Sequence, residues 1–214
     1  MELRLFPLRT VLFPGMSLPL QVFEPRYRQL IAECMEHAEP FGVALIREGV
    51  EVGGPAVPYT LGTTAHIQTV TQMAEGRLAV ATTGGKRFRV VTLHTDRPYV
   101  WAEVEYPLDE PAAVPADLIE RARTGLATFS RLRATAAGEY VREPQISDRP
   151  GPLADAIGAA SVAPPFELQR LLETLEVRRR LETALPLLDA VIANAHRQAA
   201  VAAAARWAAP GLAN

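Results

Sequence analysis

Cysteine, lysine and histidine are scarce in this sequence, and their scarcity excludes several kinds of chemistry. The 214 residues include one cysteine, Cys34, so no internal disulfide can form and a reducing compartment fits best. The one lysine, Lys86, follows Gly84-Gly85 without completing a G-x-x-x-x-G-K-[ST] phosphate loop, which argues against ATP hydrolysis. The four histidines are scattered and lack metal-ligand spacing. We therefore expect neither a metal nor a cofactor.

Long hydrophobic runs and an excess of charge of one sign are also missing. No apolar run reaches the roughly 18 residues of a membrane span, and Arg206 interrupts the Ala-rich stretch at residues 199–209. The N-terminus lacks the basic and then apolar pattern of a signal peptide. Lys plus Arg is 22 and Asp plus Glu is 24, with a pI near 6.1. We expect a cytoplasmic protein without membrane contact, for which nucleic acid is not the default partner.

Nucleophiles with a catalytic setting are equally hard to find. None of the four serines lies in a G-x-S-x-G elbow, and a Ser-Lys dyad would have to use Lys86. Cys34 falls on the apolar stripe of a predicted helix, where a buried, inert thiol is the better interpretation. The sequence therefore predicts a protein that is not an enzyme.

The first half of the chain is rich in short strand patterns. One helix interrupts them, with Pro25 at its first position and a stripe of Tyr27, Leu30, Ile31, Cys34 and Met35. The strands are predicted near residues 3–5, 18–22, 41–47, 61–70, 77–83, 86–94 and 99–105. Glycines 84 and 85 separate two of these strands, where glycine suits a hairpin turn. This pattern predicts an antiparallel barrel or sandwich.

The second half, after the proline-rich connector at residues 107–115, contains only helical patterns. Helices are predicted near residues 116–136, 153–160, 165–175 and 177–207, with a loop over residues 137–152. Pro186 should kink or split the last helix, because proline removes a backbone donor and crowds the preceding turn. The run Arg178-Arg179-Arg180 is typical of a solvated helix face.

Several segments along the chain resemble the N-terminal substrate-binding domain of Lon proteases. They lie in the family's order and cover nearly the whole chain: Leu5-Phe6-Pro7-Leu8, residues 11–27 (VLFPGMSLPLQVFEPRY), Phe41-Gly42-Val43, Gly62-Thr63, Ala65-His66-Ile67, Gly76-Arg77-Leu78, Arg87-Phe88-Arg89-Val90, Pro98-Tyr99, Ala102-Glu103-Val104, Leu153-Ala154-Asp155 and residues 168–181. The resemblance implies an α+β fold, in which a PUA-like pseudo-barrel of about six strands with one inserted helix precedes a C-terminal helical bundle. We place the barrel at residues 1–110 and the bundle, packed on it, at residues 111–214.

A full Lon protease continues into an ATPase and a Ser-Lys peptidase module, and the motifs of neither occur here. The resemblance therefore implies a free-standing, non-catalytic module that binds an unfolded or extended polypeptide, with a separate protease or chaperone as a further partner. The candidate ligand-binding residues are Phe13, Met16, Arg26 and Tyr27, with Phe13 and Met16 presenting apolar surface from a turn.

A structural role for the same motif is the alternative. Pro14-Gly15 then makes a turn, Arg26 pairs with Glu24 or with another acidic residue to fix the helix entry, and Phe6, Leu20 and Phe23 fill the barrel core.

Two other functions stay open. RNA binding is supported by fold analogy alone, because PUA-like folds also occur in RNA-associated proteins and fold does not imply function. Lys86, Arg87 and Arg89 could then form a basic strand edge. The third is a hydrolase of a small substrate, assembled from residues that the sequence does not reveal.

Overall fold

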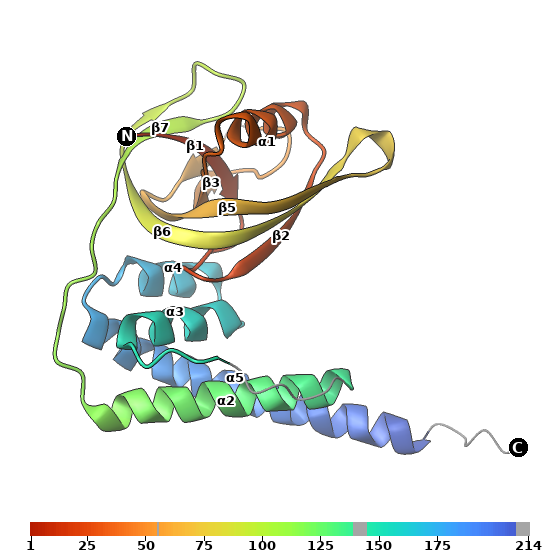
Figure 1. Ribbon diagram of the computed structural model, residues 1–214, viewed down its shortest axis with the longest axis vertical. Helices are drawn as coiled ribbons and strands as arrows, with labels where there is room; N and C mark the ends of the chain where they lie inside the picture. The colour runs from red at the N-terminus through yellow and green to blue at the C-terminus, as the bar shows by residue number, and fades with distance from the viewer. Residues whose placement is uncertain (55, 139–144, 209–214) are drawn as a thin grey trace, which may run out of the picture. The chain divides into compact units, whose positions relative to one another are not determined.

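The structure is a computed structural model that describes residues 1–54, 56–138 and 145–208. By contacts the chain divides into two compact units, Met1–Glu110 with Pro164–Leu175, and Pro111–Ala163 with Glu176–Asn214. Unit 1 contains β1 (Glu2–Leu8), β2 (Ser17–Val22), α1 (Pro25–His37), β3 (Phe41–Gly49), β4 (Ala56–Pro58), β5 (Leu61–Gln72), a 3-10 turn (Ala74–Gly76), β6 (Leu78–His94), β7 (Trp101–Glu105) and α4 (Pro165–Glu173) (Figure 1). Unit 2 contains α2 (Ala116–Ala137), α3 (Pro150–Ala160) and α5 (Val177–Ala208).

The sheet of unit 1 closes on itself. β1, β7, β6, β5 and β3 are hydrogen-bonded in that order, and β3 returns to β1 in a parallel pairing that sets Leu5 opposite Gly42. The other pairings are antiparallel, and β2 joins the first part of β6 with Leu20 opposite Val80. The predicted α+β fold with an antiparallel pseudo-barrel is confirmed, with seven strands among the described residues where about six were expected.

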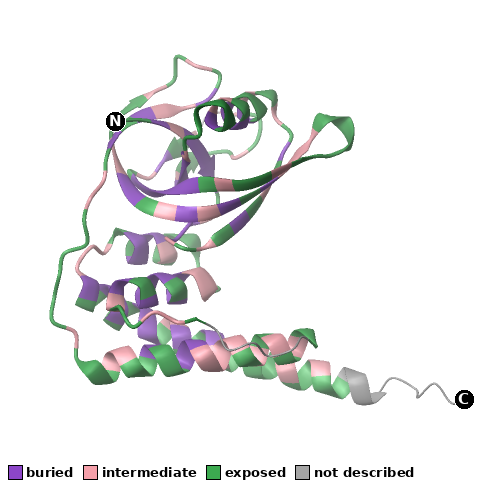
Figure 2. Cartoon of the chain, viewed as in Figure 1, coloured by how far each residue is buried: buried purple, intermediate pink, exposed green. Residues whose placement is uncertain are grey.

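Helix α1 covers one part of the barrel core. Tyr27, Leu30, Ile31 and Cys34 recur every three or four residues, and all four are buried on the side that Figure 2 shows in purple. They pack with side chains of the sheet and of the β1–β2 loop, which include Phe6, Leu8, Leu12, Val22, Phe41 and Val80. Met35 was expected on the same stripe but is 54% exposed, because it lies at the margin of the buried arc.

The hairpin predicted at Gly84-Gly85 is wrong, since both glycines lie in the middle of the continuous strand β6. Neither has a positive φ. A Cβ at Gly84 would lie 2.1 Å from the carbonyl oxygen of Phe13, and one at Gly85 would lie 2.5 Å from Nε2 of His66. Glycine is required at position 84 because the Phe13 main chain passes very close to the strand, whereas the neighbours at position 85 are the side chains of His66 and Thr64.

Helix α4 belongs to unit 1 although it follows two helices of unit 2 in the sequence. The buried Gln169 amide donates to the carbonyl oxygen of Leu61 at 2.9 Å. The Arg87 guanidinium donates to the carbonyl oxygen of Leu172, also at 2.9 Å. Leu171 and Leu172 are each 1% exposed. The helix therefore caps β5 and β6 through both hydrogen bonds and apolar contact.

In unit 2, the helices α2, α3 and α5 pack together through their apolar faces. Leu126, Leu153, Ile157 and Leu188 are buried among these helices. Pro186 does not split α5, which runs unbroken for 32 residues with that proline exposed on its surface. A proline inside a helix costs about 3 kcal/mol, and burial of the neighbouring side chains offsets that cost.

Arg180 is also placed differently from the solvated face that the sequence indicated. It is 0% exposed, and its Nε lies 3.5 Å from the carboxylate of Asp155, itself 5% exposed. Arg178 and Arg179, which directly precede Arg180 in α5, are exposed as expected. No described helix is both long and apolar enough to span a bilayer.

Candidate functional site

The loop between β1 and β2 is fastened to the middle of β6. The amide of Gly15 donates to the Gly84 carbonyl oxygen, the Gly84 amide donates to that of Met16, and both distances are 2.8 Å. A third bond, from the Met16 amide to Phe13, closes the turn, with Gly15 at φ 77°. This fastening turns the Phe13 side chain inward, where it is 0% exposed.

Phe13 therefore does not present apolar surface, and that expectation is corrected. Its ring belongs to the core, as in the structural alternative. Met16 is half-buried and packs against the cluster that includes Leu12 and Leu18. The turn thus offers a small part of the Met16 side chain to solvent and nothing of Phe13.

Arg26 and Tyr27 lie at the start of α1, where they connect the helix to the loop after β3. The Tyr27 ring is 4% exposed and stacks on Phe6 with centroids 3.9 Å apart. The Arg26 guanidinium lies 4.6 Å from the Tyr27 ring centroid, pairs with Glu24 at 2.9 Å and donates to the Gly54 carbonyl oxygen. Burial raises the pKa of the Tyr27 phenol, so this ring stays neutral.

A pocket of about 150 Å³ lies beside this pair. Its walls come from β1, β2, the start of α1 and the loop after β3, and comprise Phe6, Leu8, Pro19, Leu20, Gln21, Val22, Phe23, Glu24, Tyr27, Glu51 and Val52. Phe23 is 51% exposed and Val52 55% exposed, so two large apolar side chains stand at its rim. Phe23 was expected in the core, and this expectation is also corrected.

Four consecutive residues of β2, Pro19 to Val22, line the pocket. β2 pairs with β6 on one side, and no described strand pairs with its other side. Half of the main-chain amide and carbonyl groups of such a strand point away from its neighbour. Of the four residues predicted as a site, Tyr27 lines the pocket and Arg26 borders it through Glu24, whereas Phe13 and Met16 are not in its walls.

Sequence reasoning missed Leu20, Phe23 and Val52. A signal for Phe23 was present, because an aromatic residue directly before the Glu24-Pro25 helix start lies outside the helical stripe and need not be buried with it. Val52 carried no such signal. Its position beside Phe23 depends on a contact between segments about thirty residues apart, held by the Gly53 amide, which donates to Glu24.

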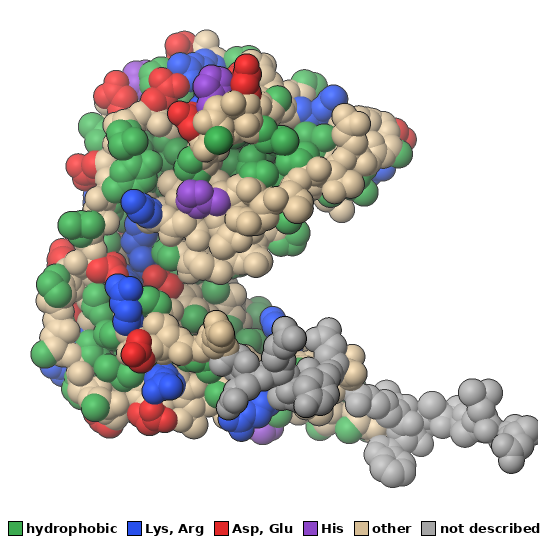
Figure 3. Space-filling model, viewed as in Figure 1, with side chains coloured by type: hydrophobic (Ala, Val, Ile, Leu, Met, Phe, Trp, Pro, Cys, Tyr) green, Lys and Arg blue, Asp and Glu red, His purple; other side chains and the backbone are tan. Residues whose placement is uncertain are grey.

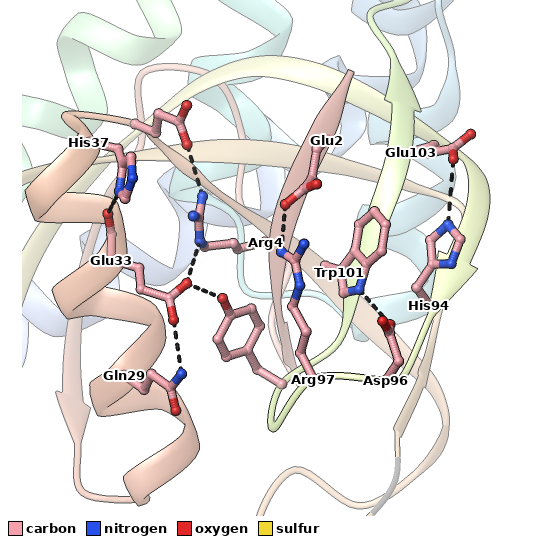
Figure 4. Close-up of polar contacts among 12 residues, drawn as sticks. Glu2, Arg4, Gln29, Glu33, His37, His94, Asp96, Arg97, Trp101 and Glu103 are labelled. Carbon is pink, nitrogen blue, oxygen red and sulfur yellow. Dashed lines mark hydrogen bonds and ion pairs between the residues drawn. The ribbon is translucent and has the colours of Figure 1, made fainter.

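A network of charged side chains covers another part of unit 1 (Figure 4). Arg4 of β1 bonds Glu33 of α1 at 3.0 Å and Glu39 at 2.8 Å, and the Tyr99 hydroxyl also donates to Glu33. The Tyr99 hydrogen bond, helped by Gln29 and Arg4, lowers the pKa of the Glu33 carboxyl to about 2. A carboxylate held so firmly as an anion is a poor proton donor or acceptor near neutral pH, so this network acts as a brace between α1 and the sheet.

The same face has a layered stack in which Trp101 lies between Arg97 and His94 (Figure 4). The Arg97 guanidinium is 4.4 Å and the His94 ring 3.9 Å from the Trp101 ring centroid. Asp96 accepts from the indole at 2.7 Å, and Glu103 lies 3.6 Å from His94. Charged side chains crowd this end of unit 1 in Figure 3, and each one in the stack is paired.

The basic edge considered for RNA does not form. Arg87 is 7% exposed and donates inward to Leu172, and Arg89 lies 3.3 Å from Glu105. Lys86 is exposed. One lysine with one paired arginine makes no continuous basic stripe of the kind that tracks a phosphate backbone.

The described residues also lack the usual parts of a metal site. No group of three or more His, Cys, Asp or Glu among them could hold a metal ion, and His66 and His94 lie opposite Thr83 and Trp101 and not opposite each other. Cys34 is 1% exposed, and burial raises the pKa of its thiol to about 11. The thiol is therefore protonated and shielded, as the sequence predicted for an inert cysteine.

The family described as the ATP-dependent protease La (LON) substrate-binding domain matches residues 2–190. The Lon protease of Anaeromyxobacter dehalogenans is 34% identical over 196 residues, which is 87% of this chain and 23% of that protein. Lon protease 2 of Myxococcus xanthus is 35% identical over the same shares of the two chains. The chain thus spans about a quarter of the length of these relatives.

Solved structures show the same architecture. The Lon N-terminal domain protein from Xanthomonas campestris is 26% identical with a TM-score of 0.67, and the match covers 87% of this chain and 98% of that one. The N-terminal domain of the Mycobacterium avium complex Lon protease, 20% identical with a TM-score of 0.66, shares the fold over 88% of this chain and 98% of its own.

Proposed function

Because this chain belongs to the Lon substrate-binding domain family, we propose that it is a non-catalytic module that holds an extended or unfolded polypeptide in the pocket beside β2. The observation that carries this proposal is an apolar pocket lined by β2 and rimmed by two exposed apolar residues, Phe23 and Val52. A folded protein presents few such side chains together unless a partner covers them.

The pocket favours recognition through side chains over a full strand addition. Pro19 lies at the centre of β2 opposite Ala81, and proline is tolerated in a sheet where its nitrogen faces away from the paired strand. An added strand would therefore find no amide donor at the middle of this edge. A client side chain that enters the pocket beside Leu20, Phe23 and Tyr27 meets no such obstacle.

The predicted site residues have different roles in this proposal. Tyr27 forms part of the pocket wall, and Arg26 holds the loop that contributes Val52, through Glu24 and Gly54. Met16 is outside the pocket walls and packs against the core cluster, with part of its side chain exposed. Phe13 acts from the core by supporting the β1–β2 loop.

The proposal needs no cofactor, and it assigns no catalytic role to the chain. It includes a cytoplasmic location and a separate protease or chaperone that acts on the bound polypeptide. RNA binding has less support, because Arg87 is buried and Arg89 is paired with Glu105.

Replacing both Phe23 and Val52 with Ser tests the proposal. Full burial of a large apolar side chain contributes roughly 1.5 to 3 kcal/mol, so the half-exposed pair should weaken binding of fluorescein-labelled β-casein, an unfolded protein, by about tenfold or more. The melting temperature should change little, because both side chains are already about half exposed.

Leu108→Ser is the matched control, since Leu108 is 85% exposed in unit 1 and lies outside the pocket. Casein binding measured by fluorescence anisotropy should be the same for this control and for the unaltered chain. Equal casein affinity in the Phe23 and Val52 double variant would place the client elsewhere and overturn the proposal for this pocket.

A further inference from the structure

In unit 2, two long helices continue beyond the end of the short helix that packs on them (Figure 1). α2 has 22 residues and α5 has 32, whereas α3 has 11 and ends at Ala160. At 1.5 Å per residue, α3 covers about 16 Å of a pair in which α2 alone is about 33 Å long. The seam between α2 and α5 is therefore filled by α3 along part of its length only.

A groove of about 470 Å³ begins where α3 ends. Ala160 and the segment 161–163 form one end of it, Phe129 and Arg133 come from α2, and α5 contributes residues between Leu187 and Gln198. Its floor is largely apolar, because Val191 and Ala195 face it from α5 and Phe129 faces it from α2. Val162 stands at its margin with 91% of its surface exposed.

The residues that α5 contributes recur with helical spacing. Leu187, Val191, Asn194 and Gln198 lie four, three and four residues apart, so they form one stripe along the helix. Phe129 and Arg133, four residues apart, form a parallel stripe on α2. Two parallel helical stripes with a gap between them make the kind of groove that accepts the apolar face of a third helix.

The charged residues that the structure describes in the walls of this groove are two arginines, Arg133 and Arg197. The Arg133 guanidinium lies 6.0 Å from the Phe129 ring centroid, and Arg197 approaches the Asn194 side-chain oxygen at 3.5 Å. Neither forms an ion pair with a described residue, and none of the described residues that line the groove is Asp or Glu. An occupant with carboxylates beside its apolar side chains would complement both the apolar floor of the groove and its two arginines.

We propose that this groove is a docking site for an acidic amphipathic helix of a partner protein, which continues the line of α3 between α2 and α5. A second copy of this chain fits less well, because the same face would bring two more arginines and no carboxylate. The site is separate from the pocket beside β2 and belongs to unit 2, so it offers a place to bind a folded partner while unit 1 holds a client.

Two designed peptides of about 14 residues test the proposal with the full chain. Both have leucines at helical i, i+3, i+4 and i+7 spacing, with glutamates at the remaining positions of one and lysines at those of the other. By fluorescence anisotropy, the glutamate peptide should bind about tenfold or more tightly than the lysine peptide. Arg133→Glu combined with Arg197→Glu should reverse this order.

Arg131→Glu combined with Arg179→Glu is the control, because both arginines are exposed on the same two helices and neither lines the groove. It should leave the preference for the glutamate peptide unchanged. A fluorophore on Val162→Cys locates the complex, since the native Cys34 is 1% exposed and does not compete for the label. Its emission should change when the glutamate peptide binds.

Three results would overturn the proposal. The first is equal affinity for the two peptides, or an equal effect of the control pair and the groove pair. The second is a change in the label's emission when decanoate is added but none when the glutamate peptide is added, which would indicate a lipid site. The third is a dimer in analytical ultracentrifugation that the Arg133 and Arg197 variant abolishes, which would show that a second copy fills the groove.

Discussion

Gly84 provides a sharp test of how the barrel is assembled, because a side chain at this position meets main-chain atoms. A Cβ there would lie 2.1 Å from the Phe13 carbonyl oxygen, and ordinary carbon–oxygen contacts begin at about 3.3 Å. Gly84→Asn must therefore displace the β1–β2 loop by about 1.2 Å and disturb two hydrogen bonds of 2.8 Å, one from the Gly15 amide to the residue 84 carbonyl and one from the residue 84 amide to the Met16 carbonyl. Overpacking costs about 1 to 3 kcal/mol and each lost hydrogen bond about 0.5 to 1.5 kcal/mol, so we expect a loss of about 2 to 6 kcal/mol in the free energy of unfolding.

Gly15→Asn is the matched control, because it makes the same substitution in the β1–β2 loop that contacts Gly84. Gly15 has φ 77°, and nothing lies within 4 Å of a Cβ built there. Asparagine tolerates this left-handed conformation, so this variant should lose less than about 1 kcal/mol. Urea denaturation followed by circular dichroism measures both values. If Gly84→Asn proves as mild as Gly15→Asn, residue 84 lies in a permissive turn and the strand assignment is refuted.

Four further outcomes follow from the structure. Arg180→Met should cost about 3 to 5 kcal/mol of unfolding free energy, because it removes the buried cation that lies 3.5 Å from the buried Asp155 carboxylate, and adding Asp155→Leu should recover part of that loss in urea denaturation. Because the pKa of the Glu33 carboxyl is lowered, the folding stability that this carboxylate contributes is fully present above its usual pKa of 4.5. It is lost as the pH falls through about 2. Because this carboxylate is partly exposed, the stability difference between the unaltered chain and Glu33→Gln should be about 1 to 2 kcal/mol near neutral pH and should vanish toward pH 2, as urea titrations at several pH values would show. The Cys34 thiol should react with Ellman's reagent only as fast as the protein opens, and rapid reaction of the folded chain would contradict its burial. A shortened chain that ends at Glu110 should melt at a lower temperature than the full chain in calorimetry, since it lacks α4, and an equal midpoint would show that α4 contributes nothing to unit 1.

Local signals in the sequence were sufficient for most elements of the fold. Pro25 and Pro165 each begin a helix, because a proline at the first position loses no helical hydrogen bond. The periodicity of Tyr27 to Cys34 identified the buried face of α1. Strand alternation located the barrel strands to within a few residues, although the short β4 escaped notice because three residues show no clear alternation.

Features that depend on long-range contacts were predicted poorly. Gly84 looked like a turn residue because its real constraint, the Phe13 carbonyl, lies far away in the sequence. Arg180 looked like part of a charged surface because its partner Asp155 is on another helix. Both errors have the same origin, since a local pattern shows the conformations that a residue can adopt but not what packs against it.

The candidate site shows the same limit. Tyr27 was identified from a resemblance and lines the pocket, whereas Phe13, identified in the same way, is in the core. The rim residues Phe23 and Val52 meet only because the loop after β3 is held against the start of α1. A pocket assembled from three segments has no signature in any one of them.

The placement of α4 in unit 1 also has a consequence for how the protein is made. The last barrel strand ends at Glu105, but the helix that covers Leu61 and Arg87 begins at Pro165. At synthesis rates of about 5 to 20 residues per second, the ribosome needs roughly 3 to 12 s to add the intervening stretch. During that interval the nascent barrel exposes the surface that Leu171 and Leu172 later bury. A chaperone that binds near the ribosome would therefore find its site on this protein for a few seconds in each round of translation.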